Sequence, residues 1–472
     1  MERISDIKII LGLMLLQLAV CLPFISSFPV ALDEPFSIYW SQQDMGGMLD
    51  ELAKGNNAPL HFILLKGWTS VFGISPFGVR SLSLFFGVLS IYPLYKIAKL
   101  LMTKQWAVLV GGMFIFSKLA HFHFMEARMY GLFVMIFLFI LYDLLLIWKK
   151  NKVVWWRLGL LNAALFATHY LGAVVIGFEL LFLLIIIRGI GKSNLFKLVA
   201  AYLISLLLAL PFIIDFFSRL GDFNANGTWV EIPAYADIPI VLFKFFNNPF
   251  GFIFLVGLVL VSFLITRNTS AIKEKKVNLL FFLYWSALPF TFFFYFSRLK
   301  QPIFLERYML FIIPGILLLI VYWVFLQWER KKISWFSYAL IIPLAAAVQF
   351  KPDNNREPDL AADYVKSLES ENTAIAIFPM YYGLTFIYHY NPEWIGEGFY
   401  ENLTAANISS IYSFEDILIN SETEQLILLD SNGSEFYPGN TVMQDCLDWG
   451  RMKNQGTFAG GLNIYQFERN EN

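Results

Sequence analysis

Long apolar runs separated by short polar turns fill the first 350 residues of the chain. A run of about 20 apolar residues is long enough to cross the hydrocarbon core of a bilayer as a helix. The pattern predicts a polytopic α-helical membrane protein with about eleven spans, although 155–188 could instead be one kinked helix with an interfacial piece. The predicted spans are residues 7–27, 78–100, 105–123, 129–148, 155–168, 170–188, 196–217, 250–267, 277–297, 308–327 and 333–349.

The loop of residues 29–77 is long compared with most other connections. It places two adjacent carboxylates, Asp33 and Glu34, shortly after the first span. Within it, residues 59–73 are apolar but too few to cross a membrane, which fits an interfacial or re-entrant helix. Three further acids are more simply explained as solvated residues: Asp44, Asp50 and Glu51.

The pattern changes after residue 350. Residues 351–358 form a polar linker flanked by prolines. Strands then alternate with helices, which predicts a small α/β unit. The expected helices are 359–369, 381–390, 413–420 and 440–449, and the expected strands are 373–378, 425–429 and 463–467. The chain thus divides into a transmembrane domain of residues 1–350 and a soluble domain of residues 351–472.

The composition agrees with a membrane protein. The 472 residues are 57% hydrophobic and only 15% charged, whereas a soluble domain has about a quarter charged residues. The formal net charge of −1 creates no overall field that would attract nucleic acid. The two cysteines, Cys21 and Cys446, lie far apart in unlike contexts, so we expect no disulfide framework.

Basic residues sort to one side of the predicted bundle. Lysine and arginine are enriched in the cytoplasmic loops of membrane proteins. With eleven spans, one side receives the basic clusters within residues 99–104, 149–157, 188–197, 267–276 and 330–332. The loop 29–77 and the soluble domain then lie on the extracytoplasmic face of a cell inner or plasma membrane.

Asp33 and Glu34 are the candidate catalytic residues. A carboxylate at a membrane-edge cavity can take a proton from an acceptor hydroxyl as a general base. Acids beside a membrane are costly to desolvate, and those that face a cavity tend to be functional. The alternative is a solvated pair at the start of a helix, where acids are also favoured.

Two motifs on the same predicted face carry arginine. Glu126, Arg128 and Tyr130 lie at the outer end of the third span, and Arg307 and Tyr308 enter the tenth. The planar guanidinium group is suited to binding phosphate. Each motif alone could instead be a surface ion pair or an interfacial anchor.

The histidines are candidates for substrate contacts. His169 lies in an otherwise apolar stretch, where a hydrogen-bonded packing residue is the plainer interpretation. His61, His121 and His123 could join a sugar or metal site on the outer face. Five histidines without zinc-like spacing make no compelling ligand set, so no cofactor is certain and a divalent cation stays an alternative.

The sequence contains no Walker motif, dinucleotide-binding motif or His-x-x-Glu-His motif. No predicted cytoplasmic loop is long enough to form a nucleotide-binding domain. These observations exclude an ATPase and a transferase that takes a nucleotide sugar through its own cytosolic domain. An enzyme acting at the outer face would therefore need a lipid-linked donor.

The order of these motifs resembles the polytopic glycosyltransferases of the type C fold, near the protein O-mannosyltransferases and bacterial family 39 relatives. The resemblance covers about residues 1–330. It rests on six elements in order: Leu32-Asp33-Glu34, Ala58-Pro59-Leu60-His61, Arg80 before a small-residue span, Met125-Glu126-Ala127-Arg128-Met129-Tyr130, Thr168-His169-Tyr170 and Arg307-Tyr308. Ala58, His61 and Met125 depart from the usual proline, tyrosine and glutamine, which bears on sugar and acceptor preference.

The resemblance implies inverting transfer of a sugar, a hexose such as mannose or a pentose, from polyprenyl phosphate to an acceptor hydroxyl of a glycan, lipid or protein. Asp33 would be the general base, with Glu34 positioning or binding substrate. Arg128 and Arg307 would bind the lipid phosphate. Glu126 would orient Arg128 or the sugar. The other implied substrate-binding residues are His61, Tyr130, His169 and Tyr308.

Three other functions stay open. A transporter or flippase of envelope precursors would place ionisable residues at mid-membrane and show repeat symmetry, whereas here acids gather on one loop and no inverted repeat is evident. An envelope polymerase or ligase would use a lipid-linked glycan as the acceptor. A binding module on a membrane anchor would need far fewer than eleven spans.

Overall fold

The structure is a computed structural model that describes residues 5–55, 57–218, 230–266, 269–328, 341, 345–346 and 350–470. It divides into two compact units. The first contains residues 1–23, 49–61 and 80–350, and the second contains residues 24–48, 62–79 and 351–472. The loop after the first helix therefore contributes to both units.

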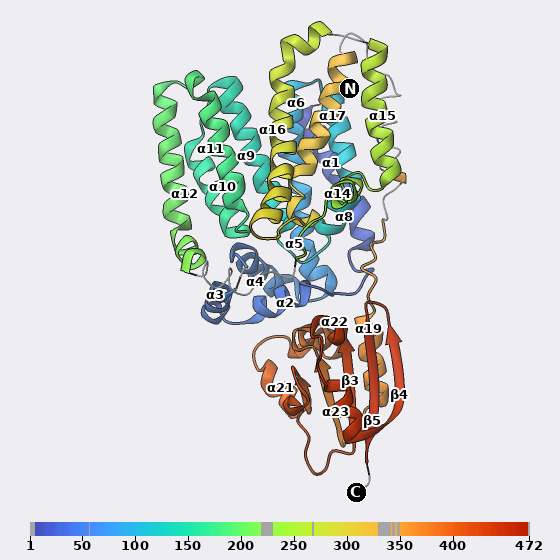
Figure 1. Cartoon of the computed structure of the whole chain (residues 1–472). Coiled ribbons are helices and arrows are strands. Elements are labelled where there is room, and N and C mark those ends of the chain that lie inside the picture. Colours follow the sequence, from blue (N-terminus) through green and yellow to red (C-terminus); the bar gives the residue numbers. More distant parts are fainter. Residues whose placement is uncertain are drawn as a thin grey trace. The chain divides into compact units, whose positions relative to one another are not determined.

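The first unit is built of helices that lie side by side (Figure 1). They are α1 (Asp6–Cys21), α5 (Pro76–Leu89), α6 (Ile91–Leu101), α7 (Lys104–Ile115), α8 (Lys118–Phe124), α9 (Tyr130–Lys150), α10 (Trp155–Thr168), α11 (Gly172–Ile186), α12 (Lys192–Ser218), α14 (Asp237–Phe245), α15 (Pro249–Thr266), α16 (Thr269–Leu299) and α17 (Ile312–Trp328). All predicted spans but the last coincide with one of these helices or with two in succession. The predicted span 333–349 lies almost entirely outside the described residues, and so do the basic residues 330–332.

The predicted number of spans is supported only in part. In the described part of the chain, six helices are long and apolar enough to cross a membrane, or up to eight if each of two bent helix pairs is one span. α10 and α17 match predicted spans, but they have 14 and 17 residues, fewer than the roughly 20 that a full crossing requires. The predicted span 105–123 is bent by 65° between α7 and α8.

A close backbone approach and an ion pair pack α10 against its neighbours. A Cβ atom at Gly159 would lie 2.6 Å from the Ala201 carbonyl oxygen of α12, so only glycine permits this contact. The Arg157 guanidinium donates hydrogen bonds to the buried carboxylate of Asp143 in α9. Residues 169–171, between α10 and α11, are not helical. Of the two predicted arrangements for 155–188, two separate helices are therefore observed.

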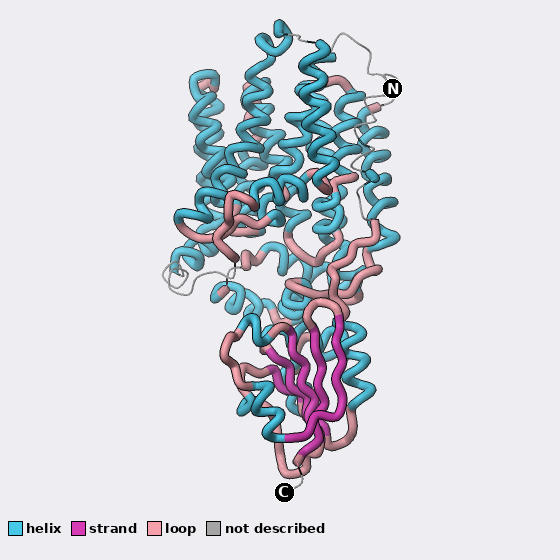
Figure 2. The backbone as a smooth tube through the Cα atoms, turned by 45° about the vertical axis from the view of Figure 1, so that its right-hand side comes forward, coloured by secondary structure: helices cyan, strands magenta, loops and turns pink. Residues whose placement is uncertain are grey.

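The C-terminal part of the second unit is a five-stranded mixed sheet with helices (Figure 2). Its strand order is β2-β1-β3-β5-β4, with β1 parallel to β2 and β3, and β5 antiparallel to β3 and β4. The strands are β1 (Thr373–Phe378), β2 (Ile408–Ser410), β3 (Gln425–Ser431), β4 (Gly450–Phe458) and β5 (Leu462–Arg469). The helices are α19 (Pro358–Leu368), α20 (Gly383–Tyr390), α21 (Phe399–Ala405), α22 (Gly433–Phe436) and α23 (Val442–Trp449). The expected α/β character is confirmed.

The apolar strands of this sheet were predictable and the polar ones were not. β1, β3 and β5 coincide with predicted strands, and every residue of β1 is buried. β2 has only three residues, and β4 is a mostly exposed edge strand without an apolar run. The predicted helix 413–420 is wrong, because only Phe414–Asp416 forms a short 3-10 turn there.

Three short helices make up most of the loop 29–77: α2 (Glu34–Gln42), α3 (Met45–Lys54) and α4 (Leu60–Phe72). α4 coincides with the segment predicted to be interfacial, and its 13 residues are too few for a span. Asp44 accepts hydrogen bonds from the Gly46 and Gly47 amides at 2.9 and 3.0 Å. Its carboxylate therefore caps the N-terminus of α3.

Candidate active site

Seven of the nine candidate site residues belong to the first unit. They lie around the turn between α8 and α9 and around the 3-10 turn η3 (Glu306–Met309). These seven are His61, Glu126, Arg128, Tyr130, His169, Arg307 and Tyr308. The other two, Asp33 and Glu34, belong to the second unit.

Backbone contacts fix the turn that carries Arg128. The Arg128 amide donates to the Glu126 carbonyl oxygen at 2.7 Å, and the Ser83 hydroxyl of α5 donates to the Arg128 carbonyl oxygen, also at 2.7 Å. A Cβ atom at Gly131 would lie 2.4 Å from the Ser83 carbonyl oxygen. Glycine at this position therefore lets α9 begin directly against α5, with the Arg128 side chain 7% exposed beside it.

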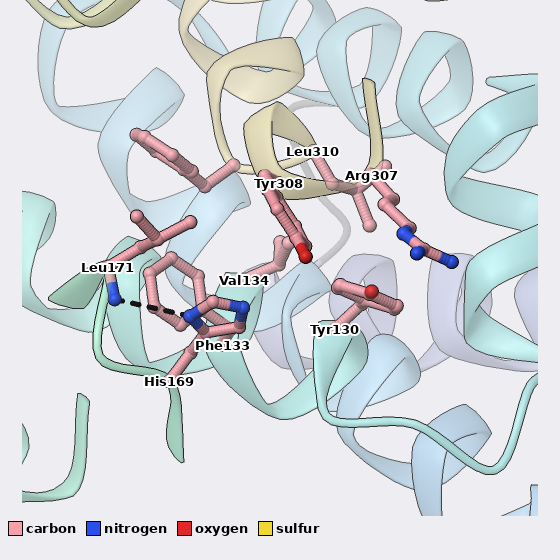
Figure 3. Close-up of a pocket in the computed structure, with 9 residues that line it drawn as sticks. Tyr130, Phe133, Val134, His169, Leu171, Arg307, Tyr308 and Leu310 are labelled. Carbon is pink, nitrogen blue, oxygen red and sulfur yellow. Dashed lines mark hydrogen bonds between the residues drawn. The ribbon is translucent and has the colours of Figure 1, made fainter. Parts of the chain in front are cut away.

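A pocket lies at the N-terminal end of α9 (Figure 3). The Tyr130 and Tyr308 rings border the same space, with His169 on one side and Arg307 on the other (Figure 3). The pocket is lined by Tyr130, Phe133, Val134, His169, Leu171, Arg307, Tyr308, Leu310 and Phe311. Polar groups from three separate elements, α9, the α10–α11 break and η3, thus meet around mostly apolar walls.

His169 is a neutral hydrogen-bond donor. Its Nδ1 accepts a hydrogen bond from the Leu171 amide at 3.1 Å (Figure 3), so the ring proton lies on Nε2. Desolvation, followed by the positive charges of Arg128 and Arg307, lowers the pKa of His169 to about 3. The His169 ring also contacts the Tyr308 ring edge to face, with centroids 5.3 Å apart.

His61, at the start of α4, is buried in the same way. Its Nε2 lies 3.4 Å from the Ala127 carbonyl oxygen. Desolvation and the charge of Arg128 lower the pKa of His61 to about 3. Two neutral imidazoles therefore lie in the positive potential of Arg128, one on each of two elements that are 108 positions apart in the sequence.

Two carboxylates near the arginines have basic partners of their own. Glu126 Oε2 lies 2.5 Å from His123 Nδ1, and Glu306 Oε1 accepts a hydrogen bond from Lys244 Nζ at 2.6 Å. Burial alone would raise the pKa of Glu306, but the hydrogen bond and charge of Lys244 hold that pKa below its usual value. The carboxylate of Glu306 is therefore ionised at neutral pH and is matched by a lysine.

In the second unit, the acidic pair forms the start of α2. Asp33 is the N-cap residue, yet its side chain makes no capping hydrogen bond. Glu34 is the first helical residue and is only 2% exposed. Leu32, just before the pair, has a left-handed backbone with φ of 58°, which costs a non-glycine residue roughly 1–2 kcal/mol. Such strain concentrates at functional sites.

Three polar residues of the first unit were not among the nine candidates. His123 was considered only as a general sugar or metal contact, although it lies three residues before Glu126 and is therefore close to it in the chain. Lys244 is 62 positions from Glu306, so no local signal joins them. Arg80 of α5 is fully buried. A buried arginine in an apolar helix is costly unless it serves a pair or a site.

The positive charge at this site comes from the arginine side chains. Among the residues with described positions, no group of three or more His, Cys, Asp or Glu side chains could hold a metal ion. Two guanidinium groups, neutral imidazole donors and phenol hydroxyls form a set that can bind and stabilise an anionic oxygen group such as a phosphate.

Residues 56–218 match the sequence profile of the dolichyl-phosphate-mannose-protein mannosyltransferase family. This region contains four of the six motifs that carried the resemblance in the sequence, from Ala58-Pro59-Leu60-His61 to Thr168-His169-Tyr170. The resemblance to this group of enzymes is therefore confirmed. No curated protein matches the chain.

Two solved structures share the fold. One is ArnT from Cupriavidus metallidurans bound to undecaprenyl phosphate, with a TM-score of 0.60, 11% identity and 98% of each chain covered. The other is the archaeal oligosaccharyltransferase AglB from Archaeoglobus fulgidus, in complex with an inhibitory peptide and a dolichol-phosphate. Its TM-score is 0.54 at 11% identity, over 96% of this chain and 74% of AglB. The chain thus has the type C glycosyltransferase fold, as expected from its motifs.

Proposed function

We propose that this protein is an inverting glycosyltransferase that moves a sugar from a polyprenyl-phosphate donor to an acceptor hydroxyl at the outer face of the membrane. The observation that carries this proposal is the pocket that Arg307, Tyr308 and the neutral His169 line, in a helical bundle with the type C fold, with Arg128 near enough for its charge to lower the pKa of His169. The lipid phosphates bound to ArnT and AglB support a donor of this class.

The proposed reaction is a single displacement. The acceptor oxygen attacks the anomeric carbon of the sugar and transfers its proton to the Asp33 carboxylate. The bond between that carbon and the phosphate oxygen breaks, and polyprenyl phosphate leaves with the bonding electrons. Arg128 and Arg307 stabilise the negative charge that develops on the phosphate, while His169 Nε2 and the Tyr130 and Tyr308 hydroxyls donate to the phosphate or the sugar. Glu34 positions Asp33 or the acceptor.

The sugar is proposed as a hexose such as mannose, or a pentose, and the acceptor as a glycan, lipid or protein. A divalent cation is not required by this scheme, because the arginines provide the positive charge opposite the leaving group.

The experiment is an assay of the purified protein in lipid nanodiscs with polyprenyl-phosphate mannose and a polyprenyl-phosphate pentose. A membrane extract of the producing cell supplies the acceptors. We expect release of free polyprenyl phosphate and labelling of an acceptor. The flippase alternative predicts that no donor is consumed, and that labelled lipid crosses the bilayer of a proteoliposome instead. That result would overturn the proposal.

The site and the soluble domain are proposed to face the outside of a cell inner or plasma membrane, because basic residues sort to the opposite side. A reporter fused after residue 472 should then be extracytoplasmic, with activity only for a reporter that works outside the cytoplasm. A fusion at the basic turn around residue 150, between α9 and α10, should show the opposite behaviour. Cytoplasmic labelling of the C-terminus would mean that the number of spans is even.

A further inference from the structure

Three side chains from the C-terminal part of the second unit donate hydrogen bonds to backbone carbonyls of the loop that carries the acidic pair. Asn354 Nδ2 donates to the Pro29 carbonyl oxygen at 2.9 Å, and His389 Nε2 donates to that of Val30 at 2.7 Å. The Tyr388 hydroxyl donates to the Ile74 carbonyl oxygen at 2.8 Å. His389 and Tyr388 are neighbours on α20, so one short helix holds both ends of the loop.

Two of the bonded carbonyls, those of Pro29 and Val30, lie directly before the strained turn at Leu32. The Glu34 amide donates to the Ala31 carbonyl oxygen at 3.2 Å across Leu32, whose left-handed backbone is unfavourable for leucine. The Leu32 side chain is 45% exposed, so its own burial does little to hold this conformation. A strained conformation persists only where its surroundings determine it, and the bonds to Pro29 and Val30 fix the chain on the N-terminal side.

Apolar packing alone does not fill the space between α20 and the loop residues to which it is hydrogen-bonded. A cavity of about 590 Å³ lies beside the bonded carbonyls, lined by residues of both segments, including Ser26, Pro29, Ile74, Asp359 and His389. Elsewhere in the same unit, the Tyr39 ring of α2 and the Phe399 ring of α21 meet edge to face with centroids 5.1 Å apart. The Val30 and Ala31 side chains are buried, so packing also holds this segment. Packing is not directional, however, and beside the cavity the hydrogen bonds from Asn354 and His389 orient the carbonyls of Pro29 and Val30.

We infer that α20 braces the acidic turn, and that His389 is a positioning residue which holds the Asp33 carboxylate in its reactive geometry through the Val30 carbonyl. The inference rests on the proposed function of Asp33. It gives the C-terminal domain a role in the chemical step, although none of its residues needs to touch the donor. A misplacement of about 1 Å in a reacting group can reduce a rate about 100-fold.

The experiment compares three variants of the full-length protein. His389→Phe keeps an aromatic ring but removes the donor to Val30, and His389→Gln restores an amide donor at a similar reach. Tyr390→Phe is the matched control, because the Tyr390 hydroxyl on the same helix donates to the Glu369 carboxylate at 2.8 and 3.0 Å and bonds no loop carbonyl. We expect kcat to fall about 10- to 100-fold in His389→Phe, with the KM for the donor unchanged. His389→Gln should recover most of kcat, and Tyr390→Phe should match the wild type.

A readout independent of activity is amide hydrogen exchange of residues 29–39. Exchange should become faster in His389→Phe and stay unchanged in Tyr390→Phe. If His389→Phe does not fold, Tyr388→Phe removes a single hydroxyl and should raise exchange around Ile74 with a smaller loss of kcat. Faster exchange in a protein without sugar-transfer activity would refute the proposed function but not the brace. Wild-type kcat and exchange in His389→Phe would overturn the inference.

Discussion

Asp33→Asn should reduce kcat for sugar transfer by roughly 1,000-fold, within the range of 100- to 10,000-fold that a general base contributes. The amide keeps the size of the side chain but cannot accept the acceptor's proton. Binding of the polyprenyl-phosphate donor should stay within about twofold, because the residues proposed to bind phosphate lie in the other unit of the chain. Steady-state transfer and equilibrium binding of labelled donor, measured on the same preparation, separate the two effects.

Asp44→Asn is the matched control for this prediction. Asp44 is an exposed acid on the same loop, and its carboxylate caps α3 through the Gly46 and Gly47 amides. Asparagine caps helices about as well as aspartate, so both activity and thermal stability should be close to those of the wild type. Full activity in Asp33→Asn would refute the assignment of the base while leaving the reaction class intact, and loss of activity in both variants would indicate a general effect of loop charge.

Arg307→Gln should reduce kcat/KM by roughly 100-fold or more, which is typical when one preorganised donor to a developing charge is lost. Arg307 lines the pocket next to Tyr308, and its charge acts on His169. Arg307→Lys should recover only part of the activity, because lysine keeps the charge but lacks the planar fork that matches a phosphate. The measurement is donor titration at fixed acceptor, together with binding of polyprenyl phosphate alone.

Arg298→Gln provides the comparison for Arg307. Arg298 is an exposed arginine near the C-terminal end of α16, where its guanidinium donates to the Pro233 carbonyl oxygen at 2.6 Å and stacks on the Tyr235 ring. Its loss should leave donor binding within about twofold. Equal losses in the two variants would point to a general contribution of positive charge at the membrane surface rather than to a phosphate contact by Arg307.

Much of the helical architecture is readable from the sequence because a membrane-spanning helix must be apolar over most of its length. Thus α9 and α12 follow from long runs that are mostly apolar. The strands β1 and β3 are apolar for a different reason, because they are buried in the hydrophobic core of the C-terminal sheet. Where apolarity is not required, the prediction fails: β4 is exposed and polar along most of its length, and the polar segment 413–420 is mostly irregular.

The candidate site, too, was predicted from the sequence only in part. Residue types and their order were enough to predict Asp33, Arg128, His169 and Arg307 as candidates, because acids and arginines are rare in apolar sequence and each suits a particular chemistry. Only the tertiary structure paired Lys244 with Glu306 and joined His389 to the Val30 carbonyl, 359 positions away. These pairings depend on how distant segments pack, and a single sequence carries no local signal for such contacts.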